Sequence, residues 1–228
     1  KYNIDISIYK SKNSFFINRG KFGEILNLIK SQKCKKVIFA GNIVKPKISK
    51  LKLDLRGLFY ISRIVKASKL GDAAILKVLI KILSENKIKV IKLNTFNPEL
   101  TLKKGVYTKI RPNLLEKEQI LKGIRALKKI NSYNHTQAVI IRDNKVISRE
   151  TRKGTKEMIK SINKSKTKKG ILIKLPKAKQ DLRVDLPTIG IDTFKDCNRA
   201  GIKGIVVKSN QNIILNKKVS IKYATQNK

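Results

Sequence analysis

The sequence has a single histidine, His135, among its 228 residues. Metallophosphoesterases of the calcineurin type need several histidine ligands, so this class of enzyme is excluded. Catalysis by a Ser-His-Asp or Cys-His arrangement would depend on His135 alone, and no nucleophile elbow or neighbouring cysteine accompanies it. We therefore expect His135 to be an ordinary polar residue at the start of a strand.

Common phosphate-binding motifs are also missing from the sequence. It contains no G-x-x-x-x-G-K-[ST] loop and no clear G-x-G-x-x-G after a predicted strand. The acid-rich helix of Nudix-type diphosphate hydrolases is absent as well. Any phosphate chemistry must therefore use other residues, and the carboxylates remain as candidates.

Cysteines are few and long apolar runs are interrupted. Cys34 and Cys197 are far apart with no C-x-x-C motif, so we expect both to be buried and reduced in a cytoplasmic protein. The run 73–83 is broken by Lys77 and Lys81, so no segment is expected to span a bilayer. No signal peptide is visible, and because the first residue is not methionine we expect the natural N-terminus to lie upstream.

Acidic residues are scarce: 15 Asp and Glu stand against 54 Lys and Arg, for a net charge of +39. Such a charge indicates nucleic acid, an anionic membrane surface or a polyphosphate ligand as the partner. The charge is mostly lysine and runs along the whole chain, whereas a phosphate-reading protein would favour arginine. Only 6% of residues are aromatic, which leaves few platforms for stacking bases. Nucleic-acid binding is therefore kept only as an alternative.

Apolar spacing predicts an α/β protein of two small domains with mostly parallel sheets. We place the domain boundary near Pro112, between domains 1–112 and 113–228, and expect Asp143 and Asn144 to form a hairpin turn. Expected helices are 22–30, 72–84, 114–130, 155–163 and a helix from Asp192 or Thr193 to about residue 200. Expected strands are 36–40, 88–93, 137–142, 145–150, 170–175, 182–186 and 204–208.

The segment 179–193 is unusual in holding three acids, Asp181, Asp185 and Asp192, within a lysine-rich chain. On an extended strand Asp181, Arg183 and Asp185 would share one face, with Pro187 ending the strand. Two carboxylates beside a guanidinium suit Mg²⁺ and a phosphate. The alternative is a solvated edge strand whose charges pair with one another.

Two pairs of candidate residues lie at predicted helix starts. Free backbone N–H groups at Gly154 and Thr155 would form an anion site where a phosphate could bind, and Asp192 and Thr193 lie at the start of a later helix. The alternative at both places is an ordinary helix cap.

Several segments together resemble the LpxI-type UDP-2,3-diacylglucosamine pyrophosphatases of lipid A biosynthesis. The most specific is the run 174–193, followed by the segment 200–205. Weaker matches fall in the family's order along the chain, at Phe39–Pro46, Asp54–Gly57, Leu70–Ala74 and Gln137–Arg142.

The resemblance implies an LpxI-type N-domain and C-domain that hydrolyse UDP-2,3-diacylglucosamine to UMP and 2,3-diacylglucosamine 1-phosphate, with Mg²⁺ as cofactor and water as nucleophile. It makes Asp181 the acid most directly tied to catalysis, with Asp185 as the second metal ligand and Arg183 beside them. The implied substrate-binding residues are Gln180, Thr188, Asp192, Thr193, Gly154, Thr155, Gly41, Asp72 and Gln137. Acyl chains on the substrate and the excess of lysine favour peripheral contact with the inner membrane, and a homodimer is an open possibility.

Two departures from the family pattern leave a catalytically impaired member as an alternative. The family begins with a strand and a turn of the form I-A-G-x-G-x-x-P, and this chain starts downstream of it. At 152–156 the family reads E-G-T-D, whereas here Lys153 and Lys156 replace two acids. Those lysines could instead bind the pyrophosphate directly.

Overall fold

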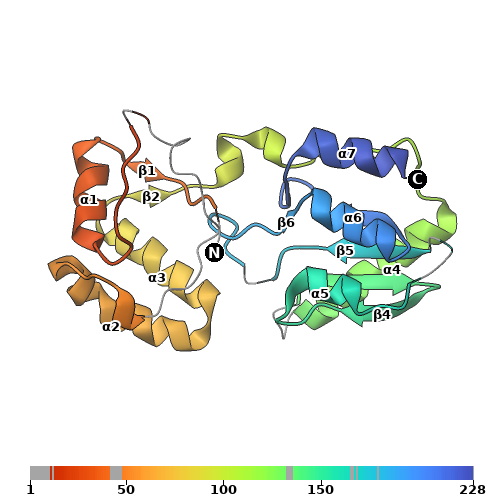
Figure 1. Ribbon diagram of the computed structural model, residues 1–228, viewed down its shortest axis with the longest axis horizontal. Coiled ribbons are helices and arrows are strands. Elements are labelled where there is room, and N and C mark those ends of the chain that lie inside the picture. Colours follow the sequence, from red (N-terminus) through yellow and green to blue (C-terminus); the bar gives the residue numbers. More distant parts are fainter. Residues whose placement is uncertain are drawn as a thin grey trace. The chain divides into compact units, whose positions relative to one another are not determined.

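The computed structural model describes residues 11, 13–41, 48–131, 136–164, 167, 169–178 and 180–227. It divides into two compact units, 1–91 and 92–228. The division falls before the boundary expected near Pro112, and the helical and extended segments of both units form an α/β fold (Figure 1).

The N-terminal unit is mostly helical. Its helices are α1 (Phe22–Ser31), the 3₁₀ turn η2 (Ile48–Lys50), α2 (Leu55–Leu70) and α3 (Asp72–Glu85). Two short strands, β1 (Lys36–Val37) and β2 (Lys89–Val90), pair in parallel. Arg63 on α2 donates two hydrogen bonds of 2.8 Å to the Glu85 carboxylate on α3, which joins these two helices.

The Asp54–Gly57 segment fixes where α2 begins. Asp54 caps α2 by accepting a hydrogen bond from the Gly57 N–H at 2.7 Å, and it also accepts one from the Glu24 N–H on α1 at 3.1 Å. Burial alone would raise the pKa of Asp54, but these backbone hydrogen bonds outweigh it and lower that pKa. A Cβ atom at Gly57 would lie 2.3 Å from the Gly20 carbonyl oxygen, so only glycine fits there.

The C-terminal unit holds the larger sheet. Its helical segments are η3 (Leu93–Thr95), η4 (Pro98–Leu100), α4 (Leu114–Asn131), α5 (Gly154–Lys160), α6 (Ile191–Arg199) and α7 (Lys217–Gln226). Its strands are β3 (Ala138–Arg142), β4 (Lys145–Arg149), β5 (Gly170–Lys174), β6 (Thr188–Ile189), β7 (Ile202–Val207) and β8 (Ile213–Ile214). Asp143 and Asn144 both have positive φ, as a tight hairpin turn requires, so the predicted β3–β4 hairpin is confirmed.

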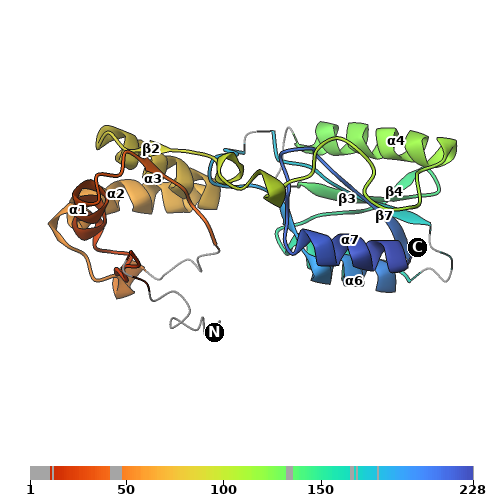
Figure 2. The same ribbon diagram turned by 90° about the horizontal axis from the view of Figure 1, so that it is seen from above.

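The main sheet has the strand order β4-β3-β5-β7 and is mixed: β3 is antiparallel to both neighbours, and β5 and β7 are parallel. Side chains alternate across it, so Ile140 and Leu172 pack toward α5 and α6, while Val139 and Ile173 pack toward α4. Figure 2 shows α4 on one face and α6 and α7 on the other. The unit is therefore a three-layer α/β/α arrangement.

Several local predictions were wrong. The expected strand at 182–186 is a turn, and the short strand β6 begins at Thr188, after Pro187. Helices α2 and α7 and the strand β8 were not predicted. Cys34 is exposed, not buried, whereas Cys197 is buried and its pKa is raised to about 12 by loss of solvation. His135 lies outside the described residues.

Candidate functional site

A buried polar network lies at the end of strand β5. The Lys174 ammonium donates a hydrogen bond to the Thr155 hydroxyl at 2.6 Å, and that hydroxyl donates to the Glu150 carboxylate at 2.5 Å. The second Glu150 oxygen accepts from the Gln137 backbone N–H at 3.0 Å. Lys174 and Glu150 are both buried, so this hydroxyl bridges a cation and an anion inside the protein.

The strand order brings these residues together. Lys174 is the last residue of β5, where it pairs with Ala138 at the start of β3 and with Val207 at the end of β7. Glu150 follows β4, and Thr155 is in the first turn of α5. In open α/β sheets, ligands bind beyond the carboxyl ends of parallel strands, and β5 and β7 both end here. This edge is therefore the natural place for a site in the C-terminal unit.

Burial is the strongest influence on the charge of Lys174. It lowers the pKa of Lys174, and the nearby Glu150 carboxylate opposes this effect without cancelling it. Lys177 is also close enough to lower the Lys174 pKa by repulsion. A second ammonium group thus lies near the first, which makes this edge attractive to an anion.

The turn that follows β5 presents the predicted acids. Within this turn, the Arg183 guanidinium donates two hydrogen bonds to the Asp181 carboxylate, from Nε to Oδ1 at 2.9 Å and from Nη2 to Oδ2 at 2.6 Å. The hydrogen bond to Asp181 raises the pKa of Arg183. Asp185 is half-buried, and its backbone N–H donates to the Asp181 carbonyl at 3.0 Å.

This geometry corrects the predicted strand face. An i+4 backbone hydrogen bond closes the chain over Leu182–Val184 into a turn, so residues 181, 183 and 185 do not alternate along an extended strand. Of the alternative, a solvated edge strand whose charges pair with one another, the ion pair is found at Asp181 and Arg183 but the strand is not. Both acids nevertheless belong to one turn, in which Asp181 is paired with Arg183 and the Asp185 backbone is bonded to the Asp181 carbonyl.

Gln180 and Asn212 connect this turn to the buried network. The Gln180 side-chain oxygen accepts from the Lys177 N–H at 2.8 Å, which fixes the bend between β5 and the turn. The buried Asn212 side chain donates to the Lys174 carbonyl at 3.3 Å and accepts from the Lys208 N–H at 2.9 Å. The ends of β5 and β7 are thus tied to the start of β8.

The other predicted residues of this unit are spread over neighbouring elements. Thr188 is exposed in β6, Gly154 has a positive φ at the start of α5, and Gln137 contributes its backbone N–H to Glu150. Asp192 and Thr193 lie in the first turn of α6, whose N-cap is Gly190. The predicted side-chain cap at Asp192 or Thr193 is therefore wrong.

Gly41 and Asp72 belong to the N-terminal unit. Gly41 follows β1 with φ of 89°, and Asp72 is the first residue of α3, just after Gly71, whose φ is 107°. Positive φ at Gly71 lets the chain reverse between α2 and α3, which explains the glycine there without a ligand. The predicted role of Gly41 and Asp72 in substrate binding stays a prediction.

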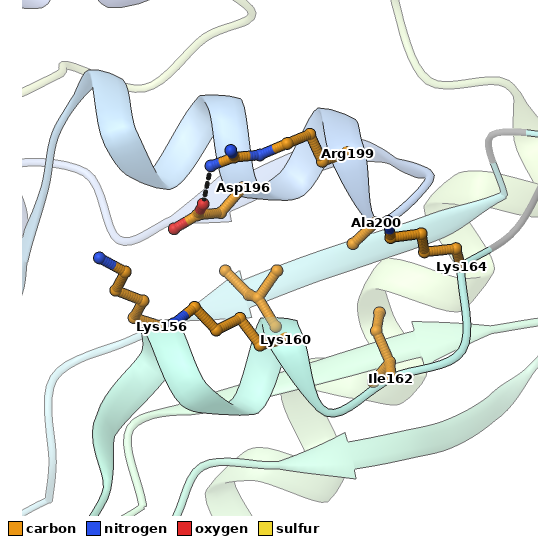
Figure 3. A pocket seen from close by; sticks show the side chains of 8 residues that line it. Lys156, Lys160, Ile162, Lys164, Asp196, Arg199 and Ala200 are labelled. Carbon is orange, nitrogen blue, oxygen red and sulfur yellow. Dashed lines mark hydrogen bonds and ion pairs between the residues drawn. The ribbon is translucent and has the colours of Figure 1, made fainter.

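A groove lies between helices α5 and α6, which pack on one face of the main sheet (Figure 3). It has a volume of about 440 Å³ and a floor that includes Ile159 and Ala200. The buried Asp196 pairs with Arg199 at its edge. Lys156, one of the two lysines that depart from the family pattern, lines it with Lys160 and Lys164. The replaced position at 156 therefore faces a cationic groove.

Comparison with known families decides the identity of the chain. The family model described as the LpxI N-terminal domain matches residues 2–100, and the one described as the LpxI C-terminal domain matches residues 103–228. This chain belongs to the LpxI family. It is 28% identical over 210 residues to a protein of Caulobacter vibrioides named UDP-2,3-diacylglucosamine pyrophosphatase LpxI, covering 89% of this chain and 75% of that protein.

The arrangement of acidic side chains and the composition of the helices bear on metal binding and on membrane insertion. Among the described residues, no three His, Cys, Asp or Glu side chains gather closely enough to hold a metal ion. In the same part of the chain, no helix is both long and apolar enough to cross a membrane. A metal site built from three or more such protein ligands is thus absent from the described residues.

The sequence did not reveal the buried half of this candidate site. Lys174 is the first residue of the matching run 174–193, but the sequence pattern predicts no role for Lys174, Glu150 or Asn212. The available signal was a lysine inside the otherwise apolar run Ile171–Leu175, because a buried lysine in a strand needs a partner. Lys179 and residues 42–46 of the weaker match lie outside the described residues.

Proposed function

We propose that this chain hydrolyses the pyrophosphate bond of UDP-2,3-diacylglucosamine, releasing UMP and 2,3-diacylglucosamine 1-phosphate in lipid A biosynthesis. The observation that carries the proposal is that both LpxI domains are matched in order along the chain, and that a relative covering most of it is named for this substrate. The protein is accordingly a hydrolase acting on a phosphoanhydride. Water attacks one phosphorus, the bridging P–O bond breaks, and the two phosphates leave as separate products.

The edge beyond β5 offers the groups that such a reaction needs. Arg183 uses Nε and Nη2 for Asp181, and its remaining N–H groups can meet a phosphoryl oxygen. Lys174 and Lys177, which lie near each other at the end of β5, add positive charge to this edge, and that charge favours a pyrophosphate over a neutral sugar. The Asp181–Arg183 pair thereby orients the guanidinium for the charge that grows in the transition state.

The donors present suit Mg²⁺ shared with the substrate. That ion needs only one or two protein carboxylates when substrate phosphates and water complete its shell. Asp181 and Asp185 in one turn fit this pattern, and they would hold the ion. When bound, Mg²⁺ would neutralise the negative charge of the pyrophosphate.

The test measures UMP release by the full-length protein from UDP-2,3-diacylglucosamine in detergent with Mg²⁺. We expect Asp181→Asn to reduce the rate by at least about a hundredfold, the scale of losing a group that stabilises transition-state charge. The control is Asp143→Asn in the β3–β4 turn, at the opposite end of β3, which should keep the wild-type rate.

Each part of the proposal has its own contradicting result. No UMP from the wild-type protein would overturn the function. Unchanged UMP release by Asp181→Asn would contradict a catalytic role for that residue. Undiminished UMP release in excess EDTA would contradict the requirement for a divalent metal ion. Restoring the family pattern at Lys153 and Lys156 tests the impaired-member alternative: a large gain in rate from Lys153→Glu/Lys156→Asp would favour it.

A further inference from the structure

The segment 103–115 of the C-terminal unit combines exposed apolar and cationic side chains, and we call it the basic-apolar segment. Its large apolar side chains are exposed, with Leu114 at 76% and Val106 at 51%. Its cations are exposed as well, and it contains no acid. The apolar members are Val106, Tyr107, Ile110, Leu114 and Leu115, and the cationic members are Lys103, Lys104, Lys109 and Arg111.

Local hydrogen bonds hold this segment in shape without burying its apolar side chains. The Tyr107 hydroxyl donates to the Lys103 carbonyl at 3.2 Å, and the Thr108 hydroxyl donates to the Ile110 carbonyl at 3.1 Å. At its end, Asn113 and Glu116 form a reciprocal capping box, with both hydrogen bonds at 2.9 Å. These hydrogen bonds tie the backbone and polar side chains locally, while the apolar side chains remain exposed.

Five exposed apolar side chains in one short segment need a partner more than single exposed apolar residues do. Lysine is depleted from the cores of protein–protein interfaces, so four cations among five apolar side chains fit such an interface poorly. Nucleic acid would need stacking platforms, and Tyr107 is the segment's only aromatic residue. An anionic bilayer accommodates both kinds of side chain, because apolar groups enter the headgroup boundary and cations meet the lipid phosphates.

We propose that the basic-apolar segment docks this protein on an anionic bilayer, with Val106 and Ile110 entering the interface and Lys104 and Lys109 meeting the lipid phosphates. Binding here needs no turnover, so it can be tested whether or not the proposed reaction is right.

The decisive test separates local insertion from the general attraction of a strongly basic chain. The full-length protein is sedimented with vesicles of phosphatidylglycerol and phosphatidylcholine, and the partition coefficient is measured. We expect Val106→Ser/Ile110→Ser to weaken partitioning by at least about tenfold, because two apolar side chains no longer enter the interface. The matched control is Leu55→Ser/Leu58→Ser, which removes two exposed apolar side chains from α2 at the same net charge.

A second pair of variants tests the cations. Lys104→Gln/Lys109→Gln should weaken partitioning more than Lys218→Gln/Lys222→Gln on α7, although both pairs lower the net charge equally. Vesicles of pure phosphatidylcholine should bind the wild-type protein several-fold more weakly.

The proposal is wrong if a test variant and its matched control weaken partitioning equally, because membrane binding would then not depend on this segment. It is also wrong if Val106→Ser/Ile110→Ser leaves partitioning unchanged but converts a dimer to a monomer, because the segment would then contact a second copy. Circular dichroism of each variant checks that these exposed substitutions leave the fold intact.

Discussion

At the scale of single residues, Lys174 is the centre of a buried polar network at the candidate site. Among the described residues it is the one lysine or arginine that is buried, and its hydrogen bond to Thr155 leads on to the Glu150 carboxylate. Removing one charge of such a buried pair leaves the other without compensation, which is costly. The network therefore stabilises the edge of the sheet on which the proposed site is built.

We predict that Lys174→Met lowers the free energy of unfolding by about 2–4 kcal/mol, because the Glu150 carboxylate stays buried without its cation. Adding Glu150→Gln should recover part of that loss, so the double variant should be more stable than the sum of the two single effects predicts. Urea unfolding followed by circular dichroism measures both. Lys208→Met, an exposed lysine just after β7, is the control and should change stability by less than about 0.5 kcal/mol. Strictly additive effects would contradict the coupling.

The two cysteines should differ in reactivity. Cys34 is exposed, whereas Cys197 is buried and its pKa is raised to about 12. Because the thiolate is the reactive form, at pH 8 a thiol reagent should modify Cys34 quickly and Cys197 only in denaturant. Spectrophotometric titration with and without guanidinium measures this, and Cys34→Ser should abolish the fast phase. Rapid modification of Cys197 in the native protein would contradict its burial.

At the scale of elements, the family's Asp54–Gly57 segment has a structural explanation. Asp54 caps α2 and reaches α1, and Gly57 allows the Gly20 carbonyl to approach closely. These contacts position two helices of the N-terminal unit. A family motif can therefore mark a packing contact as well as a catalytic group.

Gly57→Ala separates two opposing effects. Helix propensity alone would stabilise α2 by about 1 kcal/mol. The new Cβ would lie 2.3 Å from a backbone oxygen, which cannot move as a flexible side chain can. We expect the clash to dominate and to lower stability by about 1–3 kcal/mol, measured by thermal unfolding. Ser62→Ala, at an exposed position of the same helix, should be neutral or slightly stabilising, and equal effects of the two substitutions would contradict this account.

At the scale of the whole molecule, the net charge of +39 opposes folding by self-repulsion. Salt screens exposed charges over a distance of about 10 Å at 0.1 M. We therefore expect Tm to rise by several degrees between low salt and 0.3 M sodium chloride. Potassium gluconate at the same ionic strength should give the same rise. A rise with one anion only would indicate specific binding, and a fall in Tm would contradict the prediction.

The sequence by itself determined the elements whose signals are local. Helix α3 followed from its apolar spacing, the β3–β4 hairpin from Asp143 and Asn144, and the family from the segment 174–193. Such patterns depend on neighbours along the chain, so they can be seen without coordinates. Helix α2 was missed because glycine, aromatic and β-branched residues weaken its helical signal.

Only the tertiary structure decided how the candidate site is assembled. Alternating charges at 181–185 predicted a strand, but the chain closes there into a turn that is stabilised by the Asp181 carbonyl and the Arg183 ion pair. Glu150, Thr155 and Lys174 lie on three different segments and meet because β3 and β4 form a hairpin beside β5. Burial gives this contact its strength, and burial depends on the packing of the whole unit, which residue spacing does not contain.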